Sequence, residues 1–164
     1  MPKAMFDNLK EEKKQQIESA LLTVFSKSNL LSVSVKEIVE EAKIPRGSFY
    51  TYFDDQIDAY SYVLAIVLKR VHESMKGQNP FQATKDFIEG IDENPDKDFL
   101  SHYYVINEAI LEAQKDETEP EAGDGNLQNW LASVAVHHLI RRFFLNPGDK
   151  VAILDRLSAL EDWL

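Results

Sequence analysis

One short stretch, Pro45 to Phe53 (PRGSFYTYF), gathers side chains that can bind a polyanion. Arg46 carries a guanidinium, whose fork of donors can grip guanine O6 and N7, or a phosphate, through two hydrogen bonds. The stretch also supplies four hydroxyl groups, on Ser48, Tyr50, Thr51 and Tyr52. Such hydroxyls can donate to phosphate oxygens, which position a protein without reading sequence. Phe49 and Phe53 lie four residues apart, so on a helix they are expected to share its buried face.

Two short helices joined by a tight turn are predicted to position this stretch. Ser34 is a good N-cap and Glu37 follows three residues later, the pattern of a capping box. Apolar residues then recur at helical spacing and indicate one buried face; they are Val35, Ile38, Val39 and Ala42. Because Pro45 cannot stand inside a helix, a break is expected at Lys43-Ile44, before a very short helix over 47–53. This is the helix-turn-helix pattern, whose second helix enters the major groove of DNA.

The whole segment SVKEIVEEAKIPRGSFYTYF, residues 34–53, resembles the DNA-binding head of the TetR/AcrR transcriptional regulators. The shared elements are a Ser or Thr that opens the second helix, an Ile-Val pair, a basic residue with Gly at the third helix, and an aromatic-x-aromatic-Phe ending. The resemblance is dense over residues 17–60 and beyond them consists only of helical character. It implies DNA-binding residues at Ser34, Lys43, Pro45, Arg46, Gly47, Ser48, Tyr50, Thr51 and Tyr52.

The resemblance also implies a role for most of these residues. Ser34 would hold a phosphate at a helix N-terminus. Arg46 would read a base, and Gly47 would let the backbone approach the groove. Ser48 and Thr51 would contact base edges or phosphate, whereas Tyr50 and Tyr52 would hydrogen-bond phosphates.

Three departures from the family pattern weigh against strong DNA binding. Lys43 stands where the family often has Gly, and a Lys in a left-handed turn is strained. Gln56 replaces a phosphate-binding Lys, and the carboxylates of Asp54 and Asp55 repel DNA. Lysines near the N-terminus are candidates to compensate: Lys3, Lys10, Lys13 and Lys14. The departures motivate an alternative function, a helical protein–protein adaptor with a head that no longer binds DNA.

Charge and composition restrict the remaining possibilities. The 164 residues carry a net charge of −10, but residues 1–53 contain 8 Lys/Arg and 7 Asp/Glu, whereas residues 54–164 contain 10 and 21. Only the near-neutral N-terminal part is therefore expected to approach a polyanion. The absence of cysteine excludes disulfides and thiolate metal sites. With no apolar signal core and no apolar run long enough to span a membrane, a cytoplasmic location is expected.

Helical periodicity runs through the chain and predicts an all-α fold of roughly eight helices. An N-terminal three-helix helix-turn-helix head, residues 1–54, is expected to join a larger C-terminal helical bundle, residues 55–164, for regulation and dimerisation. Helices are predicted at about 9–27, 35–42, 47–53, 56–75, 80–91, 97–114, 127–145 and 149–164, with a surface loop at 115–126. Acidic residues 116–124 of that loop lack calcium-site spacing and are interpreted as solvated charge.

The C-terminal part carries no catalytic signature, so an enzyme is not expected. His137 and His138 are adjacent on a helix and point about 100° apart, which disfavours a shared metal ion; no metal or cofactor is expected.

The resemblance implies a homodimer that binds double-stranded operator DNA and a small-molecule effector that releases it. Candidate pocket residues are Phe99, Tyr103, Trp130 and His137, although aromatic residues on helices more often pack in a core than line a ligand pocket. Dimer stripes are expected on the last two helices, at Leu131, Val134, Ala135, His138 and Leu139, and at Val151, Leu154, Leu157, Leu160 and Leu164.

Overall fold

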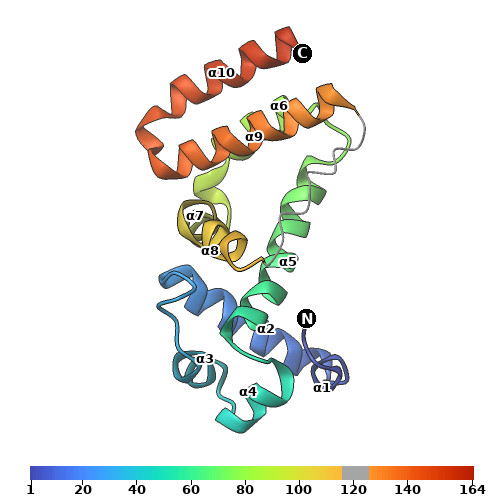
Figure 1. The fold of residues 1–164 in the computed structure, drawn as a ribbon, viewed down its shortest axis with the longest axis vertical. Helices are drawn as coiled ribbons and strands as arrows, with labels where there is room; N and C mark the ends of the chain where they lie inside the picture. Colours follow the sequence, from blue (N-terminus) through green and yellow to red (C-terminus); the bar gives the residue numbers. More distant parts are fainter. Residues whose placement is uncertain (116–125) are drawn as a thin grey trace. The chain divides into compact units, whose positions relative to one another are not determined.

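The computed structural model describes residues 1–115 and 126–164 of the chain (Figure 1). Within these residues every regular element is a helix, which confirms the all-α fold with an N-terminal helix-turn-helix head and a larger helical C-terminal part. Residues 116–125 of the predicted loop, with their acidic side chains, lie outside the described residues. None of the described helices has the length and apolar character needed to cross a membrane.

Contacts divide the chain into two compact units. The first unit comprises residues 1–71 and 98–103, and the second comprises residues 72–97 and 104–164. The first unit contains α1 (Ala4–Asp7), α2 (Glu11–Lys27), α3 (Val35–Ala42), α4 (Arg46–Tyr52), most of α5 (Gln56–Met75) and most of α7 (Lys97–His102). The predicted boundary at residues 54 and 55, which marks where the DNA-binding part ends, stays a prediction.

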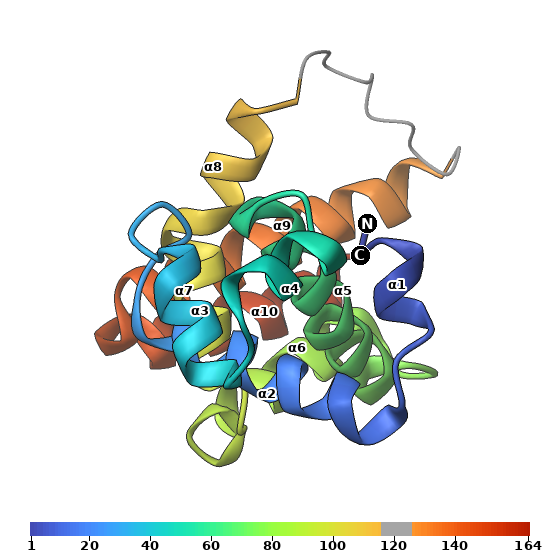
Figure 2. The same ribbon diagram turned by 90° about the horizontal axis from the view of Figure 1, so that it is seen from below.

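Helix packing in the first unit places α3 and α4 at the same end, as both views show (Figures 1 and 2). Helix α3 packs on α2 and on α4. Aromatic rings fill the core next to them: Tyr60 contacts Phe25 edge to face, with ring centroids 4.9 Å apart, and stacks on Phe99 at 5.5 Å. All three rings are almost fully buried. This core fixes the frame on which the helix-turn-helix is built.

The head contains one helix more than the three that the sequence predicts. Helix α1 has a single turn and packs against α4. An isolated helix of this length is unstable in water, so its existence depends on tertiary contacts that sequence periodicity does not contain. Helix α2 begins at Glu11 rather than at Leu9, because Lys10 adopts an extended backbone conformation and forms the N-cap.

The second unit is formed around three helices that pack on one another, α6 (Pro80–Glu89), α9 (Leu127–Leu145) and α10 (Lys150–Trp163). A π-helical turn, η2 (Tyr103–Asn107), follows α7 and belongs to the second unit from Tyr104 onward. The second unit also contains α8 (Glu108–Ala113) and two short 3-10 turns, η1 (Ile91–Glu93) and η3 (Pro147–Asp149). Tyr104 stacks on Phe144 with ring centroids 5.4 Å apart. Lys85 of α6 pairs with Glu161 of α10 at 2.9 Å.

The predicted continuous helix over 97–114 is wrong in one respect, because a π-helical turn separates α7 from α8. A π turn is wider than an α turn and satisfies its carbonyls differently. Here Nε of Arg141 on α9 donates to the carbonyl oxygen of Tyr104 at 3.3 Å. The interruption thus coincides with a contact between segments distant in sequence, which the local apolar pattern does not reveal.

Candidate nucleic-acid interface

Helix α3 begins with the capping box that the sequence predicts. The hydroxyl oxygen of Ser34 accepts a hydrogen bond from the Glu37 N–H at 3.2 Å, and the Glu37 carboxylate accepts from the Ser34 N–H at 2.8 Å. These bonds satisfy two donors at the start of the helix. Ile38 and Ala42 are fully buried, so α3 is anchored to the core by its inner face. The exposed Ser34 lies at the end of a firmly held helix.

The turn between α3 and α4 contains the left-handed residue that the family pattern suggests. Lys43 has φ 56° and ψ 45°, and it is the one residue other than glycine with positive φ among those the structure describes. A side chain in this conformation costs about 1–2 kcal/mol. The next residue, Ile44, donates its N–H to the Val39 carbonyl at 3.1 Å and is buried. The turn is therefore compact, with the exposed Lys43 at its outer edge.

Helix α4 has one buried face and one exposed face. Phe49 and Phe53 are both fully buried, with ring centroids 5.5 Å apart, which confirms their predicted place. The opposite face leaves most of the predicted DNA-binding residues accessible: Pro45, Arg46, Gly47, Tyr50 and Thr51 are exposed, and Ser48 and Tyr52 are half-buried. The structure thus brings all the predicted residues from Lys43 to Tyr52 onto one turn and one short helix.

Gly47 has no packing reason to be glycine within the described chain. A Cβ built at this position meets no atom within 4 Å. Glycine inside a helix is about 0.5–1 kcal/mol less favourable than alanine. A small residue in open space on an exposed helix suits close approach by a surface outside the chain.

The hydroxyl side chains of α4 are partly held by the protein itself. Thr51 Oγ1 donates to the Gly47 carbonyl at 3.0 Å, which leaves its lone pairs as acceptors. The Tyr50 ring packs edge to face on Phe49 at 5.3 Å, and the Tyr52 ring packs similarly on Phe6 at 5.9 Å. Ring packing restricts where the two phenol groups can reach.

The acidic residues after α4 are used to start α5. The Asp55 carboxylate accepts from the Asp58 N–H at 2.8 Å, and the Asp58 carboxylate accepts from the Asp54 N–H at 3.0 Å. These are capping bonds, and negative charge is favourable at a helix N-terminus. Asp55 therefore has a structural role that explains its presence next to a candidate DNA surface. The Asp54 carboxylate lies 3.2 Å from Nζ of Lys3.

Sequence reasoning missed the close contact of residues 3–6 with α4. Lys3 stood out only as one of four N-terminal lysines, and Phe6 was not singled out at all. Phe6 is 1% exposed and lies against Tyr52, Phe53 and Tyr62. The one available signal was an aromatic residue close to the N-terminus, next to Met5 and followed by polar residues.

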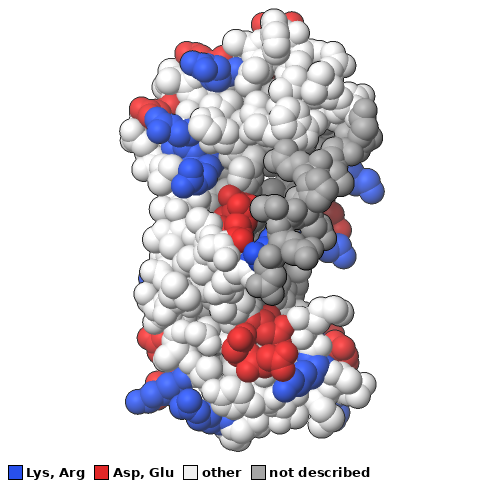
Figure 3. Space-filling view, in the orientation of Figure 1, with Lys and Arg blue, Asp and Glu red and all other residues white. Residues whose placement is uncertain are grey.

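The charges on the visible face of the first unit are mixed. Figure 3 shows acidic side chains between basic ones there, rather than a continuous basic surface. Arg46 is exposed and forms no ion pair with another described residue. The cations on this part of the head are Lys36 on α3, which pairs with Glu40 at 3.9 Å, Lys43 in the turn and Arg46 on α4, so the approach of a polyanion would depend on orientation.

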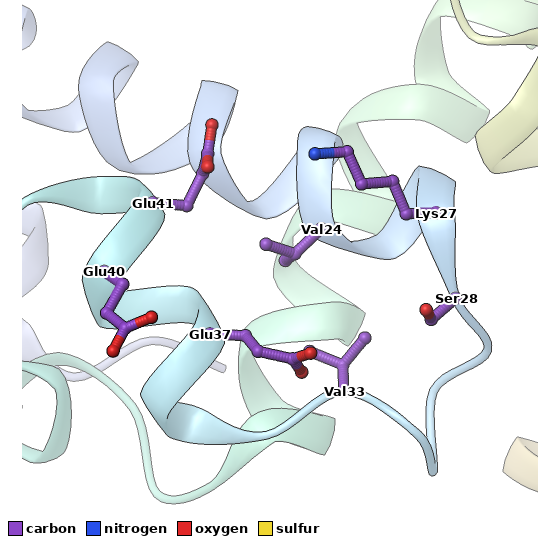
Figure 4. A pocket seen from close by; sticks show the side chains of 7 residues that line it. All are labelled: Val24, Lys27, Ser28, Val33, Glu37, Glu40 and Glu41. Atoms are coloured by element: carbon purple, nitrogen blue, oxygen red, sulfur yellow. The ribbon is translucent and has the colours of Figure 1, made fainter.

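A hollow of about 310 Å³ lies between α2 and α3. Its lining residues are Val24, Lys27, Ser28, Val33, Glu37, Glu40 and Glu41, and Figure 4 shows the three glutamates projecting from α3. The carboxylates disfavour a phosphate inside this hollow, and one of them, Glu37, also caps Ser34 at the start of α3. It contains none of the predicted effector residues.

The four predicted effector residues have different surroundings. Phe99 is 1% exposed and stacked on Tyr60, and Tyr103 is half-buried; both belong to the first unit. Trp130 is half-buried and His137 exposed, both in the second unit. An effector pocket formed by them stays a prediction.

His137 is a hydrogen-bonded surface residue. Its Nε2 lies 2.8 Å from the Glu108 carboxylate, and this hydrogen bond raises the pKa of the imidazole despite partial burial. The neighbouring Tyr104 is buried, which raises the pKa of its phenol to about 12. No group of three or more potential metal ligands occurs among the residues that the structure describes.

Comparison with known proteins agrees with the geometry of the head. Residues 17–56, which span most of α2 and all of α3 and α4, match the family described as bacterial regulatory proteins, tetR family. The chain is 32% identical over 110 residues to the HTH-type transcriptional regulator HbdR of Aromatoleum sp. (strain CIB), a match over 67% of this chain and 43% of HbdR. It is 33% identical over 100 residues to the uncharacterized HTH-type transcriptional regulator YuxN of Bacillus subtilis (strain 168), over 57% of this chain and 34% of YuxN. The chain thus spans less than half the length of these curated relatives.

Solved structures share the fold over nearly the whole chain. A TetR family transcriptional regulator from Chloroflexus aurantiacus J-10-FL has a TM-score of 0.56 and 22% identity, covering 99% of this chain and 97% of that one. NalD of Pseudomonas aeruginosa, the secondary repressor of the MexAB-OprM multidrug efflux pump, has a TM-score of 0.57 and 16% identity, with 91% and 96% covered. The capped α3, the left-handed turn, the exposed α4 and these likenesses lead to one assignment. This chain belongs to the TetR family of bacterial regulatory proteins.

Proposed function

We propose that this protein is a homodimeric transcriptional repressor that binds operator DNA through α3 and α4 and is released by a small-molecule effector. The observation that carries the proposal is the exposed face of α4. Arg46 and Gly47 lie on this face, and the helix is anchored by two buried phenylalanines on its other face. The match of residues 17–56 to the family supports the same conclusion. Binding to chromosomal DNA would place the protein in the cytoplasm.

Base reading is assigned to Arg46. Its guanidinium is exposed at the first position of α4, where residues of a recognition helix meet base edges. A bidentate contact to guanine discriminates against a wrong base by about 1–3 kcal/mol. The space around Gly47 allows the backbone to approach the groove.

The remaining head residues are assigned to the DNA backbone. The Ser34 hydroxyl and first-turn N–H groups of α3, the Lys43 ammonium and the Tyr50 and Tyr52 phenols suit phosphate oxygens. Lys43 and Tyr50 are exposed, and Tyr52 is half-buried. These contacts would set the register of α4 without selecting a base.

The homodimer is proposed to form through α9 and α10. Large apolar side chains are exposed on these helices at Leu127, Val134, Leu145, Val151 and Trp163. Of the predicted stripes, Leu139 and Leu157 are buried within the second unit, whereas Val134 and Val151 remain available. Two such faces related by a two-fold axis would bury one another. The dimer would space two α4 helices about 34 Å apart, for a palindromic operator.

The effector is proposed to act by binding the operator-free conformation more tightly than the operator-bound one, because only differential affinity shifts such an equilibrium. Phe99, Tyr103, Trp130 and His137 remain the candidate contacts. A π-helical turn begins at Tyr103, and such turns are frequent at functional sites.

The test is selection of binding sites from random duplexes by the purified protein, with Arg46→Ala in parallel. We expect enrichment of a palindrome by the wild type and loss or relaxation of one position per half-site in the variant. Lys69→Ala is the matched control, since Lys69 is an exposed cation on α5 outside the helix-turn-helix.

Two outcomes would contradict parts of the proposal. Absence of any enriched sequence at low salt, where phosphate contacts are strongest, would reject DNA binding and favour a protein-binding adaptor. Once the operator is known, a library of small molecules can be screened for displacement. If molecules shown to bind the protein leave operator affinity unchanged, the effector part is rejected.

A further inference from the structure

Residues 3–6 contact the C-terminal end of α4, about fifty residues later in the chain. The Lys3 N–H donates to the Tyr52 carbonyl at 2.8 Å, and the Lys3 ammonium donates to the Tyr50 carbonyl at 2.9 Å. Phe6 is 1% exposed, and its ring centroid lies 5.3 Å from that of Phe53. One segment therefore supplies both polar and apolar contacts to this helix end.

Helix α4 has little local stabilisation of its own. It has seven residues and includes Gly47, and its N-cap residue, Pro45, makes no side-chain capping hydrogen bond. Isolated helices shorter than about 12–15 residues are marginal in water. The last four carbonyls of a helix also lack partners within it. Here the Phe49 carbonyl accepts from the Phe53 N–H at 2.9 Å, and Lys3 satisfies the Tyr50 and Tyr52 carbonyls.

The same lysine counters negative charge at this helix end. Its ammonium lies 3.2 Å from a carboxylate oxygen of Asp54, which is exposed directly after α4. The C-terminal end of a helix carries partial negative charge, so an uncompensated carboxylate beside it would be unfavourable. That carboxylate would also repel the phosphates that Tyr50 and Tyr52 are proposed to bind. The Asp54 N–H is itself bound to the Asp58 carboxylate, which restrains the backbone there.

We propose that Lys3 is a positioning residue for operator binding. It caps the recognition helix from outside and neutralises Asp54, so that phosphates can approach Tyr50 and Tyr52. Lys3 acts through α4 and Asp54 rather than by contacting DNA. This inference rests on the proposed function, since it concerns the same surface, and it explains how a head with acidic residues after its recognition helix remains compatible with DNA.

The first measurement is hydrogen exchange of the free protein, which needs no DNA. Lys3→Met should accelerate exchange of the amides at the C-terminal end of α4, including that of Phe53. Lys3→Arg keeps the charge and donors, and should largely restore protection. Lys69→Met removes an exposed lysine elsewhere in the first unit and should leave α4 unchanged. Equal exchange in the wild type and Lys3→Met would reject the capping role.

The second measurement is affinity for the selected operator. Lys3→Met should weaken binding by about tenfold, the scale of one lost charge-assisted contact. If Lys3 acts by neutralising Asp54, then Asp54→Asn should recover most of that loss in the double variant. A direct phosphate contact predicts instead that the loss persists in the Asp54→Asn background and that the salt slope falls by about one. That result would overturn the proposal.

These readouts separate failure of the inference from failure of the proposed function. A wild-type protein that selects no operator would reject DNA binding, and with it the role of Lys3 there, while hydrogen exchange would still decide whether Lys3 caps α4. Thermal unfolding of each variant shows whether the first unit remains folded. If Lys3→Met unfolds the first unit, two other variants are used in its place. Lys3→Arg is expected to keep wild-type hydrogen-exchange protection and operator affinity. Asp54→Asn is expected to increase operator affinity. No gain in Asp54→Asn would overturn the neutralising role.

Discussion

The exposed faces of α4 and of the α9–α10 pair differ in chemistry although each of the three helices buries apolar side chains on its inner face. Helix α4 buries Phe49 and Phe53 and exposes a guanidinium, hydroxyls and a glycine. Helices α9 and α10 bury one set of apolar residues and expose another, with Val151 72% and Trp163 76% exposed. A polar face can remain hydrated until a charged partner arrives, whereas a repeated apolar face gains free energy from burial. The contrast is that expected between a surface for nucleic acid and a surface for a second copy.

The largest effect is expected inside α4. Phe49→Ala should lower the free energy of unfolding of the first unit by about 3–5 kcal/mol, because the ring is fully buried and contacts Phe53. Tyr50→Ala, on the adjacent exposed position, should cost less than about 1 kcal/mol. Chemical denaturation gives the free energy of unfolding of each variant, and hydrogen exchange of the α2 and α3 amides then reports on the first unit. Similar losses for the two variants would mean that α4 has no distinct buried face.

The next effect concerns the apolar face. Val151→Glu should weaken dimerisation by about 2 kcal/mol, since a carboxylate would lose water at the interface, while the fold of the second unit is retained. Sedimentation over a range of concentrations measures the dissociation constant, and operator affinity should fall in parallel. Asp155→Asn, another exposed position on α10, is the control. A dimer of unchanged strength would show that α10 does not form the interface through this face.

Lys43→Gly should separate stability from DNA binding. Removing the side chain from a left-handed position should stabilise the first unit by about 1 kcal/mol. Operator affinity should nevertheless fall, because one cation near the DNA backbone is lost. Thermal unfolding measures the change in stability, and operator titration at several salt concentrations measures the change in affinity. A variant that gains both stability and affinity would remove Lys43 from the proposed interface.

The smallest effect is a pH dependence in the second unit. The Glu108 hydrogen bond raises the pKa of His137 above its ordinary value of 6.5, while Arg141 opposes this and Glu112 adds to it. The folded protein thus binds the proton more tightly than the unfolded one. The stabilisation from this pair is therefore full below about pH 6.5 and disappears as the pH rises through the raised pKa. Unfolding curves of the wild type and His137→Gln should converge over that range; a constant difference would mean that the pair does not titrate as proposed.

Much of the head follows from local patterns. The capping box at Ser34 and Glu37 located the start of α3, the proline at 45 located the turn, and the spacing of Phe49 and Phe53 identified the buried face of α4. Helix α5 has the predicted limits, Gln56 to Met75. These features depend on residues within four positions of one another, where capping bonds and helical periodicity operate.

Other features depend on contacts that no local pattern contains. Helix α1 exists because Phe6 and Lys3 meet α4, and the π turn coincides with an Arg141 contact from another helix. The repulsion of DNA by Asp54 and Asp55 stays a prediction, and the structure adds that Asp54 is paired with Lys3 and that Asp55 caps α5.

Local sequence patterns account for the helical class, the helix-turn-helix and the exposed set of residues on α4, because all of these arise from hydrogen bonds and side-chain spacing within a few residues. Which charges remain available and how the short α4 is held depend instead on contacts between segments distant in the sequence. Those properties depend on the contacts of the Lys3 ammonium with the Tyr50 carbonyl and the Asp54 carboxylate. Residues so far apart in the sequence come together only when packing of the core brings their segments into contact.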